Sequence, residues 1–319
     1  MPQYSAQTVR AMILRSQCLS DPTNGTNTPD GNSILRIIER VRAIQIDTLQ
    51  RVRRSQYIAL WSRLGDYQPE LLDNLCYGDD RRLFEYWYHA ACMIPIKEFP
   101  YRLPTMLMHR KKESKRWRSW HSDEKNVEVL QEVKDRLTNQ GPQKASNFDD
   151  HRVHRGSWWD WKPAKRALEY LYDSGQVVIK DRLKFQRVYG ITENHIPREL
   201  IKSTITMDQA LTHDLELSLL ATGICTPQQV ADYTHMKRGV ARPYIRNLME
   251  RGLAHTVRAV NVKGETIDLL IHRDNIETLE QIASSEFSRS RTTFLTPFDS
   301  LFWAKGRDKE FFDFTQVLE

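Results

Sequence analysis

The residues best placed to do chemistry are Gln45 and Asp47, which flank Ile46 in the run from Ala43 to Gln50. Ile44 and Ile46 alternate with this amide and this carboxylate, and such alternation predicts an extended segment with buried isoleucines and both polar side chains on one face. A carboxylate beside an amide could hold a water molecule near a polyanion, because Arg51, Arg53 and Arg54 follow closely. The alternative is an ordinary edge strand with a polar outer face.

The composition indicates a protein that binds a polyanion. The chain has 319 residues, a formal net charge of +6, a sequence pI of about 9.1 and a mean hydropathy of −0.60. A positive balance of this size favours a nucleic acid or another polyanion as the partner and says nothing of the fold. No apolar run approaches the roughly 18 residues of a membrane span, and the N-terminus does not read as a signal peptide. The four cysteines include no CxxC pair, so the expected compartment is the cytoplasm.

The order of elements predicts an α+β, mainly helical chain. Helices are expected over 5–19, 34–42, 57–64, 69–75 and the aromatic stretch 83–91, and then over 127–139 and 162–171 before a β-hairpin at 176–189. The plan recurs as helices at 215–223, 227–233 and 240–251 and a hairpin at 253–270, the order of a winged helix. The predicted segments are 1–110, which carries the Gln-Ile-Asp motif, 111–205, 206–283, and a linker with a C-terminal portion at 284–319.

Basic side chains gather where a winged helix would approach DNA. Residues 109–121 interleave them with two tryptophans, which could stack on bases or belong to a solvated linker. Any one exposed basic residue is weak evidence, but similar placement in two segments is stronger. The candidate DNA-binding residues beyond the three arginines above are Lys111, Lys112, Lys162, Lys165, Arg166, Lys184, Arg187, Lys237, Arg238 and Arg242.

Other chemistries find little support. His151 and His154, with Asp149 and Asp150 nearby, match no metal-binding spacing, so we expect no metal. His89 lies in the aromatic stretch and is expected to be a core residue. There is no phosphate-binding glycine loop, nucleophile elbow or zinc-protease motif, and no cofactor is expected.

Several stretches together resemble the YcaQ/AlkZ-like winged-helix DNA glycosylase family. They are Ile44–Thr48, Leu60–Leu64, Phe84–Ala91, Trp158–Leu171, Phe185–Tyr189 and Pro297–Trp303, in family order over nearly the whole chain. The resemblance implies three tandem winged helices around a basic concave channel, and a monofunctional enzyme that excises cationic N7-alkylated purines and unhooks interstrand crosslinks in double-stranded DNA. It makes Gln45 and Asp47 the catalytic pair and places the chain in the YcaQ-like branch with Gln-x-Asp. A monomer associated with the nucleoid is expected.

The sequence departs from the family pattern at two places. Gln56 stands where the family has a histidine, with an expected effect on DNA contacts. The chain stops at Glu319, so a shortened C-terminal β-rich portion is expected. Two rival functions stay open: a winged-helix transcriptional regulator, and a DNA-binding relative without catalysis.

Overall fold

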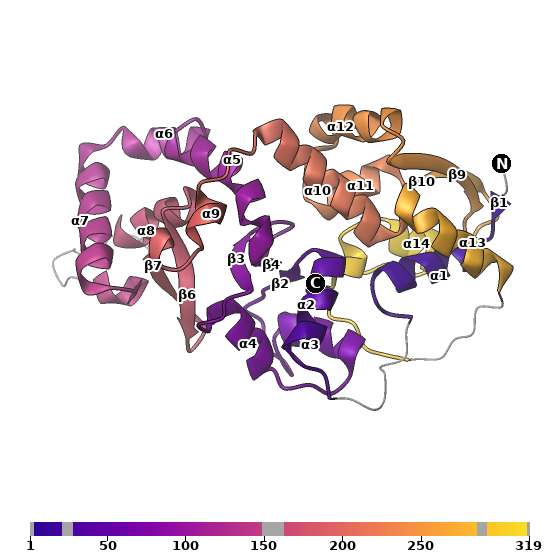
Figure 1. Ribbon diagram of the computed structural model, residues 1–319, viewed down its shortest axis with the longest axis horizontal. Helices are drawn as coiled ribbons and strands as arrows, with labels where there is room; N and C mark the ends of the chain where they lie inside the picture. Colours follow the sequence, from indigo (N-terminus) through magenta and orange to yellow (C-terminus); the bar gives the residue numbers. More distant parts are fainter. Residues whose placement is uncertain (1–2, 21–27, 149–162, 286–291, 318–319) are drawn as a thin grey trace. The chain divides into compact units, whose positions relative to one another are not determined.

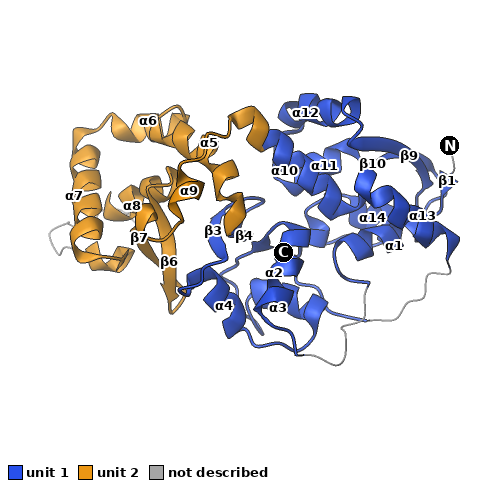
Figure 2. Cartoon of the chain, in the orientation of Figure 1, with its two compact units in different colours: residues 1–95, 211–319 blue, residues 96–210 orange. Residues whose placement is uncertain are grey.

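The computed structural model describes residues 3–20, 28–148, 163–285 and 292–317. They form the mainly helical α+β protein that the sequence predicts. The backbone divides into two compact units, unit 1 with residues 1–95 and 211–319 and unit 2 with residues 96–210 (Figure 2). None of the helices in the described ranges is both long and apolar enough for a bilayer span.

One order of elements occurs three times along the chain: a helix, a short strand, further helical turns and an antiparallel hairpin (Figure 1). In each case the short strand pairs with the second strand of the hairpin, so the strand orders β2-β4-β3, β5-β7-β6 and β8-β10-β9 are equivalent. The first occurrence consists of α2 (Gly31–Val41), β2 (Ile44–Gln45), α3 (Ser55–Leu64), α4 (Glu70–Tyr77), β3 (Leu83–Trp87) and β4 (Ala91–Pro95).

The other two occurrences follow the same plan. Most ends of the helices and hairpins predicted there lie within a few residues of the observed ends. The second, in unit 2, consists of α7 (Glu124–Gln140), β5 (Gln143–Lys144), the 3-10 helix η2 (Ala145–Phe148), α8 (Pro163–Asp173), β6 (Val177–Leu183) and β7 (Gln186–Ile191). The third consists of α10 (Met207–Thr222), which crosses the unit boundary, β8 (Ile224–Cys225), α11 (Pro227–Tyr233), α12 (Arg238–Glu250), β9 (Ala254–Val260) and β10 (Thr266–His272).

The helix predicted over 83–91 is wrong. Leu83–Trp87 is strand β3, and it pairs with β4 from Leu83 opposite Pro95 to Trp87 opposite Ala91. The first four residues of β3 are buried, so both faces of the strand are covered. A short apolar run buried on both faces lacks the alternation that separates a strand from a helix. The first occurrence therefore has a hairpin, formed by β3 and β4, where the sequence predicted none.

Both ends of the described chain complete the core of unit 1. β1 (Gln3–Tyr4) adds to the third sheet in parallel with β9. Helix α1 (Ala6–Ser16) places Val9, Met12 and Ile13 in a buried cluster with Ile271 and Phe311. The remaining elements of unit 1 are the 3-10 helices η4 (Arg273–Asn275) and η5 (Ser300–Phe302) and the helices α13 (Ile276–Ser284) and α14 (Arg307–Phe312). The described residues of 292–317 contain no strand.

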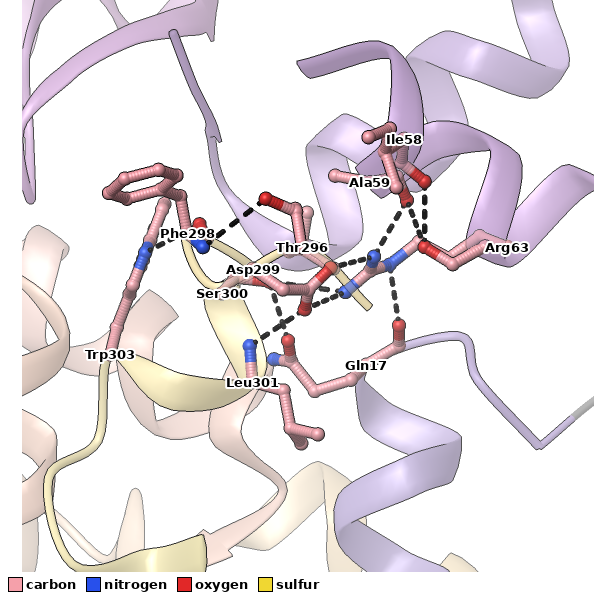
Figure 3. A network of polar contacts seen from close by, with 12 residues as sticks. Gln17, Ile58, Ala59, Arg63, Thr296, Phe298, Asp299, Ser300, Leu301 and Trp303 are labelled. Carbon is pink, nitrogen blue, oxygen red and sulfur yellow. Dashed lines mark hydrogen bonds and ion pairs between the residues drawn. The ribbon is translucent and has the colours of Figure 1, made fainter. Parts of the chain in front are cut away.

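A buried ion pair holds the C-terminal segment to helix α3 (Figure 3). Arg63 donates from Nη1 to Asp299 Oδ2 at 2.7 Å and from Nη2 to Asp299 Oδ1 at 2.9 Å, and neither side chain is exposed. Arg63 Nε also donates to the Gln17 carbonyl oxygen at 2.9 Å, while Ser300 Oγ donates to Gln17 Oε1 at 2.6 Å. These contacts join α1, α3 and η5, so the stretches Leu60–Leu64 and Pro297–Trp303 have a structural role.

In unit 2 the two tryptophans of the basic stretch 109–121 are core residues. Trp117 is 0 % exposed and Trp120 is 8 % exposed, and the Trp117 indole N–H donates to Asp173 Oδ2 at 3.0 Å. They therefore do not offer the faces that stacking on bases requires, and neither alternative from the sequence, base stacking or a solvated linker, holds for these two side chains. The remaining elements of unit 2 are η1 (Ile96–Glu98), α5 (Phe99–Arg110), α6 (Lys115–His121), η3 (Thr192–Asn194) and α9 (Arg198–Ile201).

Candidate functional site

The Gln-Ile-Asp segment leaves the edge of the first sheet, beside β4. Gln45 lies opposite Cys92, and the Ile46 N–H donates to the Ala91 carbonyl oxygen at 2.8 Å. Ile44 is 2 % exposed and Ile46 is 7 % exposed, whereas Gln45 and Asp47 are half-buried. The predicted alternation is therefore confirmed: the isoleucines join the core, and the amide and carboxylate stay within reach of solvent.

The carboxylate of Asp47 is held by the backbone that follows it. The Leu49 N–H donates to Asp47 Oδ1 at 2.6 Å, an Asx turn that fixes the side chain relative to the next two residues. Ser55 Oγ donates to the Gln45 carbonyl oxygen at 3.3 Å and ties the strand to the start of α3. Among the described residues, none hydrogen-bonds Asp47 Oδ2 or the Gln45 side-chain amide. Both groups can therefore bind a water molecule or a sugar oxygen.

The thiol next to this pair is not a nucleophile. Cys92 is fully buried, and burial raises the pKa of its thiol to about 12. The thiol thus stays protonated near neutral pH, and thiolate is the reactive form. Gln45 and Asp47 remain the candidates for chemistry in this segment.

The three arginines after the motif differ in their roles. Arg51 and Arg53 are exposed and form no ion pair with any described residue. Arg54 is half-buried and donates from Nη1 to the Thr48 carbonyl oxygen at 2.7 Å, so it supports the loop from within. Leu49 and Val52, to which the sequence assigned no role, lie in this loop with 64 % and 84 % of their side chains exposed. The sequence signal that could have identified these two exposed residues is the interleaving of apolar residues with arginines in a loop.

Gln56 lies in the first turn of α3 and does not face the solvent. It is 1 % exposed, and its Oε1 has no hydrogen-bond partner among the described residues. The neighbouring Tyr57 hydroxyl donates to Asp73 Oδ1 at 2.9 Å, and burial together with this carboxylate raises the pKa of Tyr57. The expectation that the departure at Gln56 changes a direct DNA contact therefore finds no support in the geometry.

The basic candidates of the third occurrence lie at the start of α12. Lys237, Arg238 and Arg242 are all exposed. Arg238 already forms a bidentate pair with Asp232, at 3.1 Å and 2.7 Å, which raises the pKa of its guanidinium. Lys237 and Arg242 form no ion pair with a described residue, so they are the more available charges on this helix.

The candidates in unit 2 separate by burial. Lys111, Lys112, Lys165 and Lys184 are exposed. Arg166 is half-buried, with its guanidinium carbon 5.9 Å from the centre of the Trp117 ring, and Arg187 lies in the same way 5.2 Å from Tyr172. Lys162 falls outside the described residues, as do His151, His154 and Trp158–Trp161. Within the described ranges, no group of three or more His, Cys, Asp or Glu side chains could hold a metal ion.

The fold and the motif agree with one class of protein, the DNA glycosylases. A family model described as "DNA glycosylase AlkZ-like" matches residues 38–319. The chain therefore belongs to the AlkZ-like DNA glycosylase family. A similar solved structure is that of the Streptomyces sahachiroi DNA glycosylase AlkZ, with a TM-score of 0.64 and 13 % sequence identity over 96 % of this chain and 80 % of that chain. At this identity the likeness shows a shared fold.

Proposed function

We propose that this protein is a monofunctional DNA glycosylase that excises cationic N7-alkylated purines from double-stranded DNA and unhooks interstrand crosslinks. Membership of the AlkZ-like DNA glycosylase family supports base excision in general. The finer proposal rests on Gln45 and Asp47, which are half-buried at a sheet edge with unpaired polar atoms and are followed by two exposed arginines. The three equivalent sets of elements support three winged helices as the scaffold.

Asp47 acts on the sugar and on the attacking water. Alkylation at N7 leaves the purine positively charged, so breaking the N9–C1′ bond returns the bond electrons to the base and releases it neutral. The positive charge passes to the sugar as an oxocarbenium ion, which the Asp47 carboxylate stabilises electrostatically. Water then adds to C1′ through its oxygen, and Asp47 accepts its proton as a general base. The Gln45 amide positions this water or a sugar oxygen by hydrogen bonds.

Water is the proposed nucleophile, because the motif has no amine beside it. The first lysine in the sequence is Lys97, so no lysine lies on β2, on its partner β4 or on β3. An enzyme of this type forms no Schiff base with the sugar. Borohydride treatment during excision should therefore trap no covalent protein–DNA adduct.

The basic residues supply sequence-independent affinity for the phosphates. The exposed candidates are Arg51, Arg53, Lys237 and Arg242 in unit 1 and Lys111, Lys112, Lys165 and Lys184 in unit 2, with Lys162 from outside the described residues. Arg54, Arg238, Arg166 and Arg187 have partners within the fold and are the weaker candidates. A base crosslinked to the opposite strand cannot swing freely out of the duplex. Selection of the lesion therefore follows the lability of the cationic base more than a fitted pocket. The proposed protein is a monomer that acts on cytoplasmic, nucleoid-associated DNA.

The test is incubation with duplex DNA carrying N7-methylguanine, followed by alkali to cleave abasic sites. Asp47→Asn keeps an oxygen that can accept from the Leu49 N–H, so the variant should fold and bind DNA. Loss of a general base costs about 10²–10⁴ in rate, and strand breaks should nearly vanish. Asp79→Asn, at an exposed position in the turn before β3, is the matched control and should excise as the wild type does.

Other outcomes lead elsewhere. An Asp47→Asn protein that excises at the wild-type rate would remove Asp47 from the mechanism. Tight, sequence-dependent binding to one duplex without base release would favour a winged-helix regulator. Binding without base release or sequence preference would favour a relative without catalysis.

A further inference from the structure

The loop from Thr48 to Arg53, which joins β2 to α3, presents two apolar side chains to solvent. Val52 is 84 % exposed, the highest value among the large apolar side chains of the described residues, and Leu49 is 64 % exposed. Single exposed apolar residues are ordinary on a protein surface. Two in one six-residue loop, alternating with the exposed Arg51 and Arg53, form a small amphipathic tip that the fold itself does not use.

Hydrogen bonds fix this tip relative to the candidate catalytic pair. The Leu49 N–H is the donor of the Asx turn to Asp47 Oδ1, at 2.6 Å. At the far end of the loop, Arg54 Nη1 donates to the Thr48 carbonyl oxygen at 2.7 Å, which holds the loop closed at its base. The backbone at Leu49 is thus linked directly to the Asp47 carboxylate, so a base step that the tip entered would lie close to that carboxylate.

The charges indicate what the tip enters. Arg51 and Arg53 form no ion pair with a described residue, so they are available to a polyanion on either side of Val52. Apolar side chains inserted between base steps, with basic residues on the adjoining phosphates, are a known way of unstacking a duplex. The same unstacking exposes the sugar of one nucleotide without requiring its base to leave the helix.

We infer that Leu49 and Val52 are a wedge that enters the DNA base stack beside the damaged nucleotide, with Arg51 and Arg53 on the flanking phosphates. The wedge positions the sugar of that nucleotide against Asp47 and makes no contact with the reacting atoms. This inference rests on the proposed function, and it explains how a crosslinked base could be reached while it stays tied to the opposite strand.

The test uses a duplex with 2-aminopurine, whose fluorescence rises on unstacking, next to N7-methylguanine. Asp47→Asn protein, which should leave the base in place, is compared with the same protein carrying Leu49→Ser and Val52→Ser. We expect the fluorescence to rise on saturation with the first protein and to stay at the free-duplex level with the second. In the protein with Asp47 intact, the two serines should slow single-turnover excision about 10- to 100-fold. This factor is expected if the variant must unstack one base step without the help of the wedge.

Two controls separate a wedge from a general effect on the fold. Leu49→Met with Val52→Ile keeps the apolar tip and should retain both fluorescence and rate. Val127→Ser removes an apolar side chain of 43 % exposure at the start of α7 and should change neither. A mismatch next to the lesion, which weakens the stack beforehand, should restore most of the rate to the serine variant.

The outcomes distinguish the wedge from the proposed function. Equal fluorescence and equal excision for the serine and the Met/Ile variants would overturn the wedge and leave the glycosylase standing. If the serines abolish the fluorescence rise and the protein with Asp47 intact releases no base, the wedge is supported and the proposed excision is overturned. A change in sedimentation with no change in fluorescence would assign the tip to contact with a second copy of the chain and would also overturn the wedge.

Discussion

Replacement of Asp299 by asparagine tests whether the C-terminal segment is a structural part of unit 1. The change keeps the size of the side chain, so it creates no cavity, but it leaves the buried guanidinium of Arg63 without a countercharge. Burial, the largest single effect, works against the charge of Arg63, but the attraction and hydrogen bonds of Asp299, with smaller contributions from Cys18 and Tyr233, together raise the pKa of the guanidinium. The pair is bidentate, at 2.7 Å and 2.9 Å, and neither side chain is exposed.

The magnitude follows from that geometry. Removing one partner of a buried ion pair costs about 3–5 kcal/mol, because the other charge stays buried and uncompensated. For a unit of this size, that corresponds to a fall in melting temperature of roughly 6–20 °C. Asp268→Asn is the matched control: Arg258 lies 3.6 Å from Asp268, and their side chains are 64 % and 66 % exposed. Loss of an exposed pair should cost less than about 1 kcal/mol.

Urea unfolding followed by circular dichroism and tryptophan fluorescence measures both variants. We expect Asp299→Asn to lower the free energy of unfolding of unit 1 and to leave unit 2 unchanged, since both partners belong to unit 1. A loss below 1 kcal/mol, or a loss equal to that of Asp268→Asn, would refute the reasoning, because it would mean that solvent already screens the Arg63 charge.

Two further predictions concern pH and backbone conformation. The His89 ring stacks on Trp303 with centroids 4.8 Å apart, and burial, aided by the charge of His235, lowers its pKa to about 4. The unfolded chain binds this proton near pH 6.5 and the folded chain does not, so the free energy of unfolding of unit 1 should fall as the pH is lowered from 6.5 toward 4. In urea unfolding measured against pH, His89→Phe should flatten this decline. An unchanged slope would contradict the assignment. Gly175→Ala combines a φ of +67° with a clash between the new Cβ and Met106 Sδ, whereas Gly252→Ala has the same φ of +67° and open space. Thermal unfolding should therefore show a cost of about 1–2 kcal/mol for Gly252→Ala in unit 1 and a larger one for Gly175→Ala in unit 2, and equal costs would exclude the contact with Met106.

The parts of the fold that the sequence could predict are those with local signals. The alternation of isoleucines with polar residues is such a signal. In the structure the two isoleucines of the motif are buried, and Gln45 and Asp47 are half-buried. Thr226 and Gln229 form a capping box, and α11 begins at Pro227 as predicted. The turn at Lys263-Gly264 joins β9 to β10 where the pattern had placed a hairpin.

The parts that the sequence could not predict depend on distant partners. β3 is covered on both faces, so its residues carry no alternation. The burial of Trp117 depends on Asp173, 56 residues later, and nothing in the basic stretch around it indicates that partner. At the candidate site, Gln45 and Asp47 follow from a local motif, but the exposure of Leu49 and Val52 depends on how the loop leaves the sheet.

The closure of unit 1 by its two chain segments has a consequence for the order of folding. Arg63 and Asp299 are 236 residues apart, and Gln17 and Ser300 are 283 apart, with all of unit 2 between them. On the ribosome, helix α1 emerges long before strands β8 to β10 and helix α14, which complete its core, and Arg63 emerges long before the carboxylate of Asp299. Contacts of such long separation form slowly, since a long loop must close before they contribute. Unit 2 can fold before synthesis ends, whereas the apolar face of α1 stays uncovered until these later strands and helices have been made.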